Sequence, residues 1–247
     1  MQEPEKNNRI EVCFSPKLAD DVLVRRNLIV VVVDILRATT SMVAAVGAGA
    51  AAIIPVSSPA AAREMKADGF LVAAEREGKV LDFADFGNSA FEFTKHEVRG
   101  KEIVFSTTNG TVALMKATEL GQVVLGAFSN ISALADWLAQ QDKNILILCS
   151  GWKNTFCLED TLFAGALIEH LLERSQYLIR CDSAWASLDL WEKARHDILA
   201  YVEKALHRRR LRQLGVDDVL EFSFTPDTTD VVPVLIAGGK IVNQKVL

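Results

Sequence analysis

The stretch LIVVVVD, residues 28–34, decides the fold of this chain, because six apolar residues run without a break into a single acid. Five of the six are β-branched, and such a run is typical of a strand that is buried on both faces of a sheet. Residues 39–48 predict a helix after it, and residues 52–56 predict a second, short strand. These residues therefore predict a strand, a helix and a second strand in succession, which is the start of an α/β fold.

The same alternation continues along the chain. Ser58 and Pro59 predict the start of a helix, since Ser caps an N-terminus and Pro fits the first turn, and Gly69 predicts its end. We expect further strands at residues 70–74, 102–106, 122–127, 144–149 and 231–237. We expect further helices at residues 131–140 and 159–174 and, in several pieces, at 184–212. This order predicts a layered α/β/α fold with a largely parallel or mixed sheet.

Length and charge limit the class of protein. The 247 residues, half of them hydrophobic, are enough for one large α/β domain or for two fused sub-domains. No linker or low-complexity segment divides the chain, so we interpret residues 1–247 as a single domain, and a boundary near residue 120 stays open. The net charge of −5 offers no basic surface for nucleic acid, and the short basic run at residues 207–212 does not change this.

The cysteines and the N-terminus indicate a cytoplasmic protein. The four cysteines form no C-x-x-C pair, which favours free thiols in a reducing compartment over a zinc site or disulfides. Residues 1–9 lack the apolar stretch of a secretory signal. Residues 38–56 are 19 residues without a charge, near the length of a membrane span. Their small residues favour a buried helix and a buried strand instead, so we predict no membrane partner.

Polar residues follow nearly every predicted strand. In open α/β sheets, ligands bind at the carboxyl ends of strands, so these residues are candidates for one site. Four carboxylates lie in or beside apolar segments: Asp34, Glu75, Glu159 and Asp160. Carboxylates that converge from separate strands are hard oxygen ligands for Mg²⁺. Arg37 and Arg76 offer planar forks for phosphate, sulfonate or carboxylate, and helix N-termini add N–H donors. This combination suits phosphoryl transfer.

Each feature also has a structural alternative. Asp34 suits a helix cap or an ion pair with Arg37. The pair at residues 75–76 suits a solvated loop, and residues 107–111 (TTNGT) suit a plain turn, because Asn-Gly is a general turn signal. The acids at residues 159–160 suit the positive end of a helix dipole. The position that these residues share, at the ends of predicted strands, is the one observation that favours a functional site over these structural roles.

Several established motifs are absent. The chain has no Walker loop, no dinucleotide fingerprint in a strand-to-helix context, no Asp-x-Asp after the first strand and no Cys followed six residues later by Arg. The histidines form no HExxH motif and no cluster along the sequence, so we expect structural or surface roles for all four: His96, His170, His196 and His207.

The polar stretches, taken in order, resemble the 2-phosphosulfolactate phosphatase family. They span roughly residues 28–235, and the main ones are VDILRATT (33–40), EREG (75–78), GNS (87–89), TTNGT (107–111), CSG (149–151) and LED (158–160). Gly126 with Asn130, the stretch LRQLG (211–215) and Val232-Pro233 also fit. Departures are Ala74, Ala90 and Ser150, where the family pattern has Gly, Pro and Ala; they bear on substrate identity more than on reaction type.

The resemblance implies a Mg²⁺-dependent phosphoric monoester hydrolase with an α/β architecture, and it is compatible with a homodimer. The implied substrate is a small anionic phosphate ester, 2-phosphosulfolactate or a related 2-phospho-hydroxy acid, on the route to coenzyme M. Asp34, Glu75 and Asp160 are then candidate metal ligands, and Glu159 a second ligand or general base. Arg37 and Arg76 would hold the two anionic groups. Further donors would be Thr39, Thr40, Thr108, Asn109, Gly110 and Asn130.

Two other functions stay open on the same residues. One is a non-catalytic binding or sensing protein for a phosphorylated or sulfonated metabolite, since fold does not guarantee activity. The other is a lyase or isomerase for a phosphorylated acid. Carboxylates argue against a pure anion binder, because buried negative charge without a metal disfavours anions. Release of inorganic phosphate separates a phosphatase from both.

Overall fold

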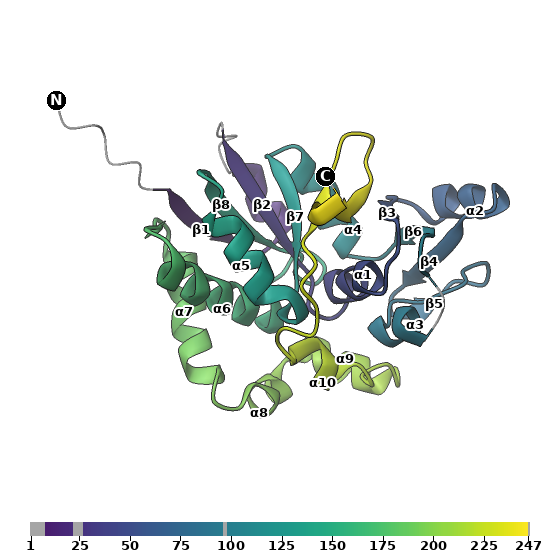
Figure 1. The fold of residues 1–247 in the computed structure, drawn as a ribbon. Helices are drawn as coiled ribbons and strands as arrows, with labels where there is room; N and C mark the ends of the chain where they lie inside the picture. Colours follow the sequence, from purple (N-terminus) through teal and green to yellow (C-terminus); the bar gives the residue numbers. More distant parts are fainter. Residues whose placement is uncertain (1–7, 22–26, 96–97, 247) are drawn as a thin grey trace.

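A mixed sheet forms the centre of the molecule (Figure 1). The structure is a computed structural model that describes residues 8–21, 27–95 and 98–246. Within these residues the sheet has 11 strands in the order β5-β4-β6-β3-β11-β10-β7-β2-β8-β1-β9. The strands are β1 (Arg9–Cys13), β2 (Leu28–Val33), β3 (Ala52–Pro55), β4 (Leu71–Arg76), β5 (Lys79–Val80), β6 (Glu102–Ser106), β7 (Gln122–Gly126), β8 (Asn144–Cys149), β9 (Leu178–Ile179), β10 (Pro233–Leu235) and β11 (Ile241–Asn243).

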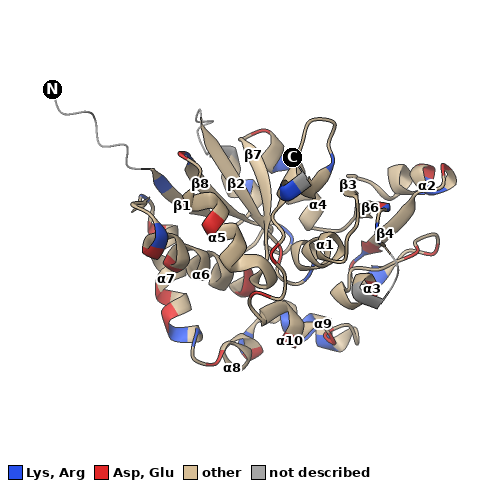
Figure 2. Cartoon of the chain, viewed as in Figure 1, with Lys and Arg blue, Asp and Glu red and all other residues tan. Residues whose placement is uncertain are grey.

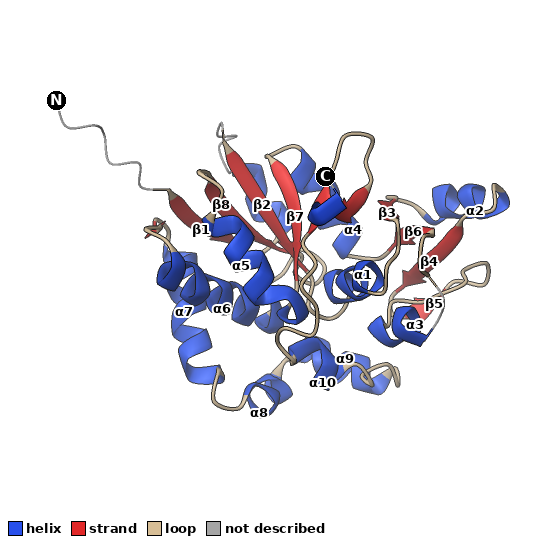
Figure 3. Ribbon diagram, viewed as in Figure 1, coloured by secondary structure: helices blue, strands red, loops and turns tan. Residues whose placement is uncertain are grey.

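Helices cover both faces of this sheet (Figure 3). The α-helices are α1 (Ala38–Gly47), α2 (Pro59–Ala67), α3 (Ala90–Lys95), α4 (Gly110–Thr118), α5 (Ile131–Ala139), α6 (Leu158–Arg174), α7 (Asp182–Ala194), α8 (Ile198–Tyr201), α9 (Leu206–Gln213) and α10 (Leu220–Phe224). Short 3-10 helices are η1 (Pro16–Asp21), η2 (Phe128–Asn130), η3 (Val202–Lys204) and η4 (Gln244–Val246). The predicted layered α/β fold with a mixed sheet is confirmed.

Strand β2 is apolar throughout because helices cover both faces of the sheet at this strand. Ile29, Val31 and Val33 pack into the core that α5 and α6 cover, and α7 packs beside α6 and against β1. Val30 and Val32 point to the other face, where α1 and α4 cover the sheet. All six strand residues are buried, since neighbouring side chains of a strand face opposite sides.

The C-terminal hairpin β10–β11 joins two groups of strands, and the strands within each group are parallel. β7, β2, β8, β1 and β9 are parallel, and so are β3, β6 and β4. The antiparallel hairpin β10–β11 pairs with β7 on one side and β3 on the other. Three antiparallel pairings in succession give the two groups opposite strand directions, so the sheet is mixed.

Several local predictions are confirmed. The uncharged stretch at residues 38–56 folds as α1 and β3 inside the protein, and none of the helices in the described residues is long and apolar enough to cross a membrane. Ser58 caps α2, since its hydroxyl accepts a hydrogen bond from the Ala61 N–H at 3.1 Å. Gly69 ends that helix with φ of +91°. The sequence pattern did not indicate β1, β5, β9, β11, α3, α4 or α10, all of which have six residues or fewer except α4, which has nine.

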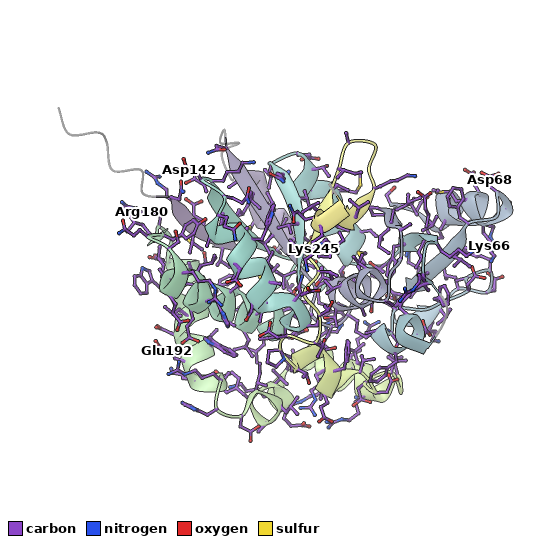
Figure 4. The ribbon with its side chains drawn as sticks, in the orientation of Figure 1. Lys66, Asp68, Asp142, Arg180, Glu192 and Lys245 are labelled. Carbon is purple, nitrogen blue, oxygen red and sulfur yellow. The ribbon has the colours of Figure 1, made fainter. Side chains whose placement is uncertain are left out.

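Charged side chains lie mostly on the outer helices and loops, where both signs are mixed in this view (Figure 2). Figure 4 shows the labelled side chains of Asp142, Arg180 and Glu192 at the outer edge of the fold. The carboxylates that the sequence singled out lie elsewhere. They are all buried, with exposed fractions of 7% for Asp34, 5% for Glu75, 1% for Glu159 and 2% for Asp160.

Candidate active site

A small polar pocket lies where the chain leaves β2, β4 and β6, and α9 completes it. Its cavity volume is about 30 Å³, so the lining side chains leave room for little more than an ion or a water molecule. The residues that line it are Asp34, Leu36, Arg37, Glu75, Gly78, Asn88, Thr107, Thr108, Asn109, His207, Arg210 and Leu211. The α9 residues come from a segment that is far from the strands in sequence.

Asp34 stands at the end of β2, beside the first turn of α4. A Cβ atom on Gly110 would lie 2.4 Å from the Ala38 Cβ and 3.1 Å from the Asp34 Oδ2, so glycine lets α4 approach this closely. Burial raises the pKa of Asp34 to about 6, although the nearby His207 opposes the shift. A carboxylate buried in this way is stabilised by any cation that enters the pocket.

Glu75 holds two loops of the pocket together. Its Oε1 accepts a hydrogen bond from the Thr108 N–H and its Oε2 accepts one from the Gly78 N–H, both at 2.7 Å. Glu75 is therefore not part of a solvated pair. Arg76 points away from the pocket, because its guanidinium donates to the Ser106 carbonyl at 3.0 Å and to the Ser106 hydroxyl at 2.9 Å. Burial lowers the pKa of Arg76.

Two arginines supply positive charge to the pocket. Arg37 is buried and donates to the Val216 carbonyl at 3.3 Å, and burial lowers its pKa. Arg210 donates to the Glu77 carbonyl at 3.0 Å, and its guanidinium lies 5.1 Å from the centre of the Trp152 ring. Neither makes an ion pair within 4.0 Å with a residue that the structure describes. Both guanidinium groups are thus available to an anionic ligand.

Asp160 joins the ends of β2 and β8. Its Oδ1 accepts from the Ile35 N–H at 2.9 Å and its Oδ2 from the Gly151 N–H at 3.1 Å. Burial raises the pKa of Asp160 well above its ordinary value, and the negative charges of Asp34 and Glu159 add to the shift. Asp160 does not line the pocket, so it shapes the pocket from behind.

Glu159 and His207 form a buried pair. The Glu159 Oε1 lies 2.8 Å from the His207 Nδ1, and the Glu159 Oε2 has no hydrogen-bond partner among the described residues. The ring of Trp152 stacks near that of His207, with centroids 6.2 Å apart and planes at 17°. His207 lines the pocket, whereas Glu159 lies behind it.

Three of the predicted donors, Thr39, Thr40 and Asn130, make hydrogen bonds within the protein and do not line the pocket. The Thr39 hydroxyl donates to the Asp34 carbonyl at 3.0 Å and accepts from the Asp34 N–H at 2.9 Å. The Thr40 hydroxyl donates to the Ile35 carbonyl at 2.9 Å. Asn130 accepts from the Ala127 N–H and donates to the Val231 carbonyl, both at 3.0 Å, which ties the C-terminal segment to the end of β7.

Comparison with known proteins decides the family. The family model described as 2-phosphosulpholactate phosphatase matches residues 13–238, which include every residue that lines the pocket. The chain belongs to the 2-phosphosulfolactate phosphatase family. Its resemblance to that family in sequence motifs is thereby confirmed.

Named relatives of this 2-phosphosulfolactate phosphatase family match nearly the full chain. One from Caldanaerobacter subterraneus subsp. tengcongensis is 36% identical over 213 residues, covering 85% of this chain and 88% of the relative. One from Thermotoga maritima is 34% identical over 214 residues, covering 87% and 92%. One from Synechocystis sp. is 35% identical over 215 residues, covering 85% and 89%. All three are named "Probable 2-phosphosulfolactate phosphatase".

Within this family member, the pocket contains residues that sequence reasoning missed. His207 and Arg210 belong to the short basic run that we considered only in relation to nucleic acid, yet α9 places both in the pocket. Asn88 was part of a family motif but not of the predicted site. His207 is buried and pairs with Glu159, so of the two expected roles the surface one does not apply to it, and His96 lies outside the described residues.

Oxygen donors in the pocket fit a hard divalent cation. The carboxylates of Asp34 and Glu75 line it, and the buried Asn88 Oδ1 has no hydrogen-bond partner among the described residues. Carboxylate and amide oxygens are the ligands that Mg²⁺ prefers. A second group, Cys157, Glu159 and His207, has potential ligand atoms within 4.8 Å of one another. Ligands at about 2.0–2.1 Å from a tetrahedral ion would be separated by about 3.3 Å. The 2.8 Å distance therefore indicates a hydrogen bond between Glu159 and His207.

Proposed function

We propose that this protein is a Mg²⁺-dependent phosphatase that hydrolyses a small anionic phosphate ester to a hydroxy acid and inorganic phosphate. The substrate would be 2-phosphosulfolactate or a related 2-phospho-hydroxy acid, as the names of the relatives suggest. The observation that carries the proposal is the meeting of two carboxylates, Asp34 and Glu75, with two cations, Arg37 and Arg210, in one small pocket.

The carboxylates would hold the metal. Asp34 and Glu75 face the pocket, Asn88 adds an amide oxygen, and the buried Asp160 adds negative charge close to Asp34. When bound, Mg²⁺ supplies positive charge that stabilises the transition state of phosphoryl transfer. Without a cation, the buried carboxylates would repel a phosphate ester, so their presence favours a metal-dependent reaction over simple anion binding.

The remaining residues would bind and orient the ester. Arg37 and Arg210 can each grip a phosphate, carboxylate or sulfonate with two N–H groups. Thr108 and Asn109 lie at the N-terminal end of α4, where backbone N–H groups and the helix dipole favour an anion. Two cationic side chains and one helix end suit a substrate that carries a phosphate and further acidic groups.

Phosphate release tests the proposal directly. Purified protein would be incubated with 2-phosphosulfolactate, phospholactate and phosphoglycolate, in Mg²⁺ and in EDTA. Wild type and Asp34→Asn would be compared, with Asp189→Asn as the matched control on the exposed face of α7. We expect Mg²⁺-dependent release that Asp34→Asn lowers by at least about 100-fold, a loss typical of a charge that stabilises the transition state. Tight binding of an ester without release would favour the sensing protein, and conversion without free phosphate a lyase or isomerase.

Assembly, location and pathway stay predictions. Trp185 in α7 is 54% exposed, whereas Trp191 packs against the core and donates to the Glu169 carboxylate at 2.7 Å. We expect a homodimer, which light scattering after size-exclusion chromatography would detect. Cys149, Cys157 and Cys181 form no disulfide with a described residue, in keeping with the expected cytoplasmic location. The link to coenzyme M depends on the substrate that the protein prefers.

A further inference from the structure

A second, larger cavity adjoins the pocket and is called the outer cavity below. Its volume is about 350 Å³, against about 30 Å³ for the pocket, and this is within the usual size range of ligand sites. Arg37, Gly78 and Asn88 line both spaces, so a shared wall connects them. Residues of α3 and of the loop that follows α9 complete the outer cavity.

The ester of the proposed reaction needs such a second space. One water molecule takes up about 10–15 Å³ of a cavity, so the pocket has room for a metal ion and a few oxygen atoms at most. The organic part of a 2-phospho-hydroxy acid must then extend beyond it. The outer cavity shares three lining residues with the pocket, more than the cavities beside Thr108 and beside His207 do. It is therefore the space that the organic part reaches most directly.

Arg37 lies at the junction of the two spaces. It is 6% exposed, and its Nη1 donates to the Val216 carbonyl at 3.3 Å, which connects it to the loop after α9. Burial lowers the pKa of Arg37, and the charges of Asp218 and Glu92 are among those that oppose this shift. Both of these acids line the outer cavity. Two carboxylates therefore act on the one cation among its lining residues that the structure describes.

Glu92 is held in place by the loop that precedes α3. Its Oε2 accepts a hydrogen bond from the Gly87 N–H at 2.5 Å. A Cβ atom on residue 87 would lie 2.7 Å from the Val80 Cγ2 and 3.3 Å from the Glu92 Oε1, so glycine lets the carboxylate come this close. Asp218 is exposed by contrast, and neither acid forms an ion pair within 4.0 Å with a residue that the structure describes. The negative charge at Glu92 is thus fixed in position.

This charge distribution discriminates between substituents of the ester. A sulfonate in the outer cavity would meet two carboxylates, and it would share the attraction of Arg37 with the phosphate. A hydroxyl group can instead donate a hydrogen bond to a carboxylate, which only accepts. The chain also departs from the family pattern at this cavity, since Ala90, which replaces Pro, directly follows Ser89 in its wall.

We propose that the outer cavity binds the organic part of the ester, and that Glu92 makes the protein select 2-phospho-hydroxy acids with a hydroxyl group on the third carbon over those with a sulfonate there. The inference rests on the phosphatase function proposed above and narrows its substrate class. The phosphate stays in the pocket, and the third carbon enters the outer cavity beside Glu92. Both kinds of ester remain substrates, because the reacting phosphate is bound in the same way.

Two esters that differ only in this substituent test the inference. kcat/KM for phosphate release in Mg²⁺ would be measured with 2-phosphoglycerate, which carries the hydroxyl group, and with 2-phosphosulfolactate, which carries the sulfonate. We expect wild type to prefer the hydroxyl ester by at least about 10-fold, the scale of a like-charge contact at a partly exposed site. In Glu92→Gln, which keeps an acceptor for the Gly87 N–H, this preference should fall by about 10-fold.

Matched variants separate selectivity from damage to the fold. Glu64→Gln, on an exposed residue of α2, should leave the ratio of the two kcat/KM values unchanged. Asp218→Asn should shift the ratio in the same direction as Glu92→Gln but by a smaller factor, because Asp218 is more exposed. Circular dichroism would verify that each variant is folded, and Asp218→Asn keeps the test available if Glu92→Gln is not.

The ways in which the two proposals could fail are distinguishable. If wild type releases no phosphate from either ester, the proposed function fails and the inference fails with it. If wild type is active but prefers the sulfonate ester, the function stands and the selectivity assigned to the outer cavity is overturned. The same holds if the ratio in Glu92→Gln and in Asp218→Asn equals that of wild type.

Discussion

Replacing Asp34 with Asn should stabilise the metal-free protein while it removes activity. Burial raises the pKa of Asp34 from 3.8 to about 6, so the folded state holds the proton more tightly than the unfolded state. At about 1.4 kcal/mol per pH unit, this difference costs about 3 kcal/mol of stability when the carboxylate is charged. Asn has nearly the same shape and carries no charge, so the variant avoids that cost.

The effect has a defined pH dependence. Between pH 3.8 and 6 the folded state binds more protons than the unfolded state, so wild-type stability decreases as pH rises through this window. The advantage of Asp34→Asn should therefore be about 3 kcal/mol at pH 7.5 and only about 1 kcal/mol at pH 4.5. Urea unfolding in EDTA at the two pH values measures it, with Asp189→Asn as an exposed control.

Two results would refute this reasoning. An advantage that is the same at both pH values would mean that charge burial at Asp34 is not its cause. A loss of stability in Asp34→Asn at pH 7.5 would mean that the carboxylate holds structure, as a helix cap would. Adding Mg²⁺ should reverse the order, because a ligand that binds only the folded wild type stabilises it by mass action.

Three further substitutions test other parts of the site. Gly110→Ala places a methyl group 2.4 Å from the Ala38 Cβ, so α4 must move; we expect about 1–3 kcal/mol of destabilisation in urea and lower kcat/KM. Arg210→Ala should lower kcat/KM by about 10–100-fold, the usual value for a charged hydrogen bond, whereas the exposed Arg209→Ala should leave it unchanged. Asn130→Ala removes buried hydrogen bonds to Ala127 and Val231 and should cost about 3 kcal/mol; unchanged stability would mean that the C-terminal segment is held elsewhere.

Much of the fold could be predicted because the central strands are unambiguous. β2 and β8 are runs of branched apolar residues that end at polar ones, and the expected boundaries of β6 and β8 agree with the structure. The expected strand at residues 231–237 contains β10, but the hairpin β10–β11 could not be predicted in the same way. Its strands have three residues each, and they are defined by pairing with β7 and β3, which lie far away in sequence.

The site was predictable where residues follow strands and not where a helix folds back. Asp34 and Glu75 stand at strand ends, so the rule for α/β sheets found them. His207 and Arg210 reach the pocket only because α9 packs across the strand ends, and no local pattern encodes that packing. Arg208 shows the same limit: it looks like a surface residue, yet it is buried and donates to the Leu199 carbonyl at 2.9 Å.

Phosphorus NMR of the reaction tests the central claim most directly. 2-Phosphosulfolactate would be mixed with Mg²⁺ and catalytic amounts of wild-type protein, and its ³¹P signal followed with time against Asp34→Asn under identical conditions. We predict that the ester signal disappears with wild type as inorganic phosphate grows in equal amount, and that it persists with Asp34→Asn or with EDTA. An ester signal that stays constant with wild type in Mg²⁺, or that disappears equally fast with Asp34→Asn, would contradict a metal-dependent phosphatase centred on this pocket.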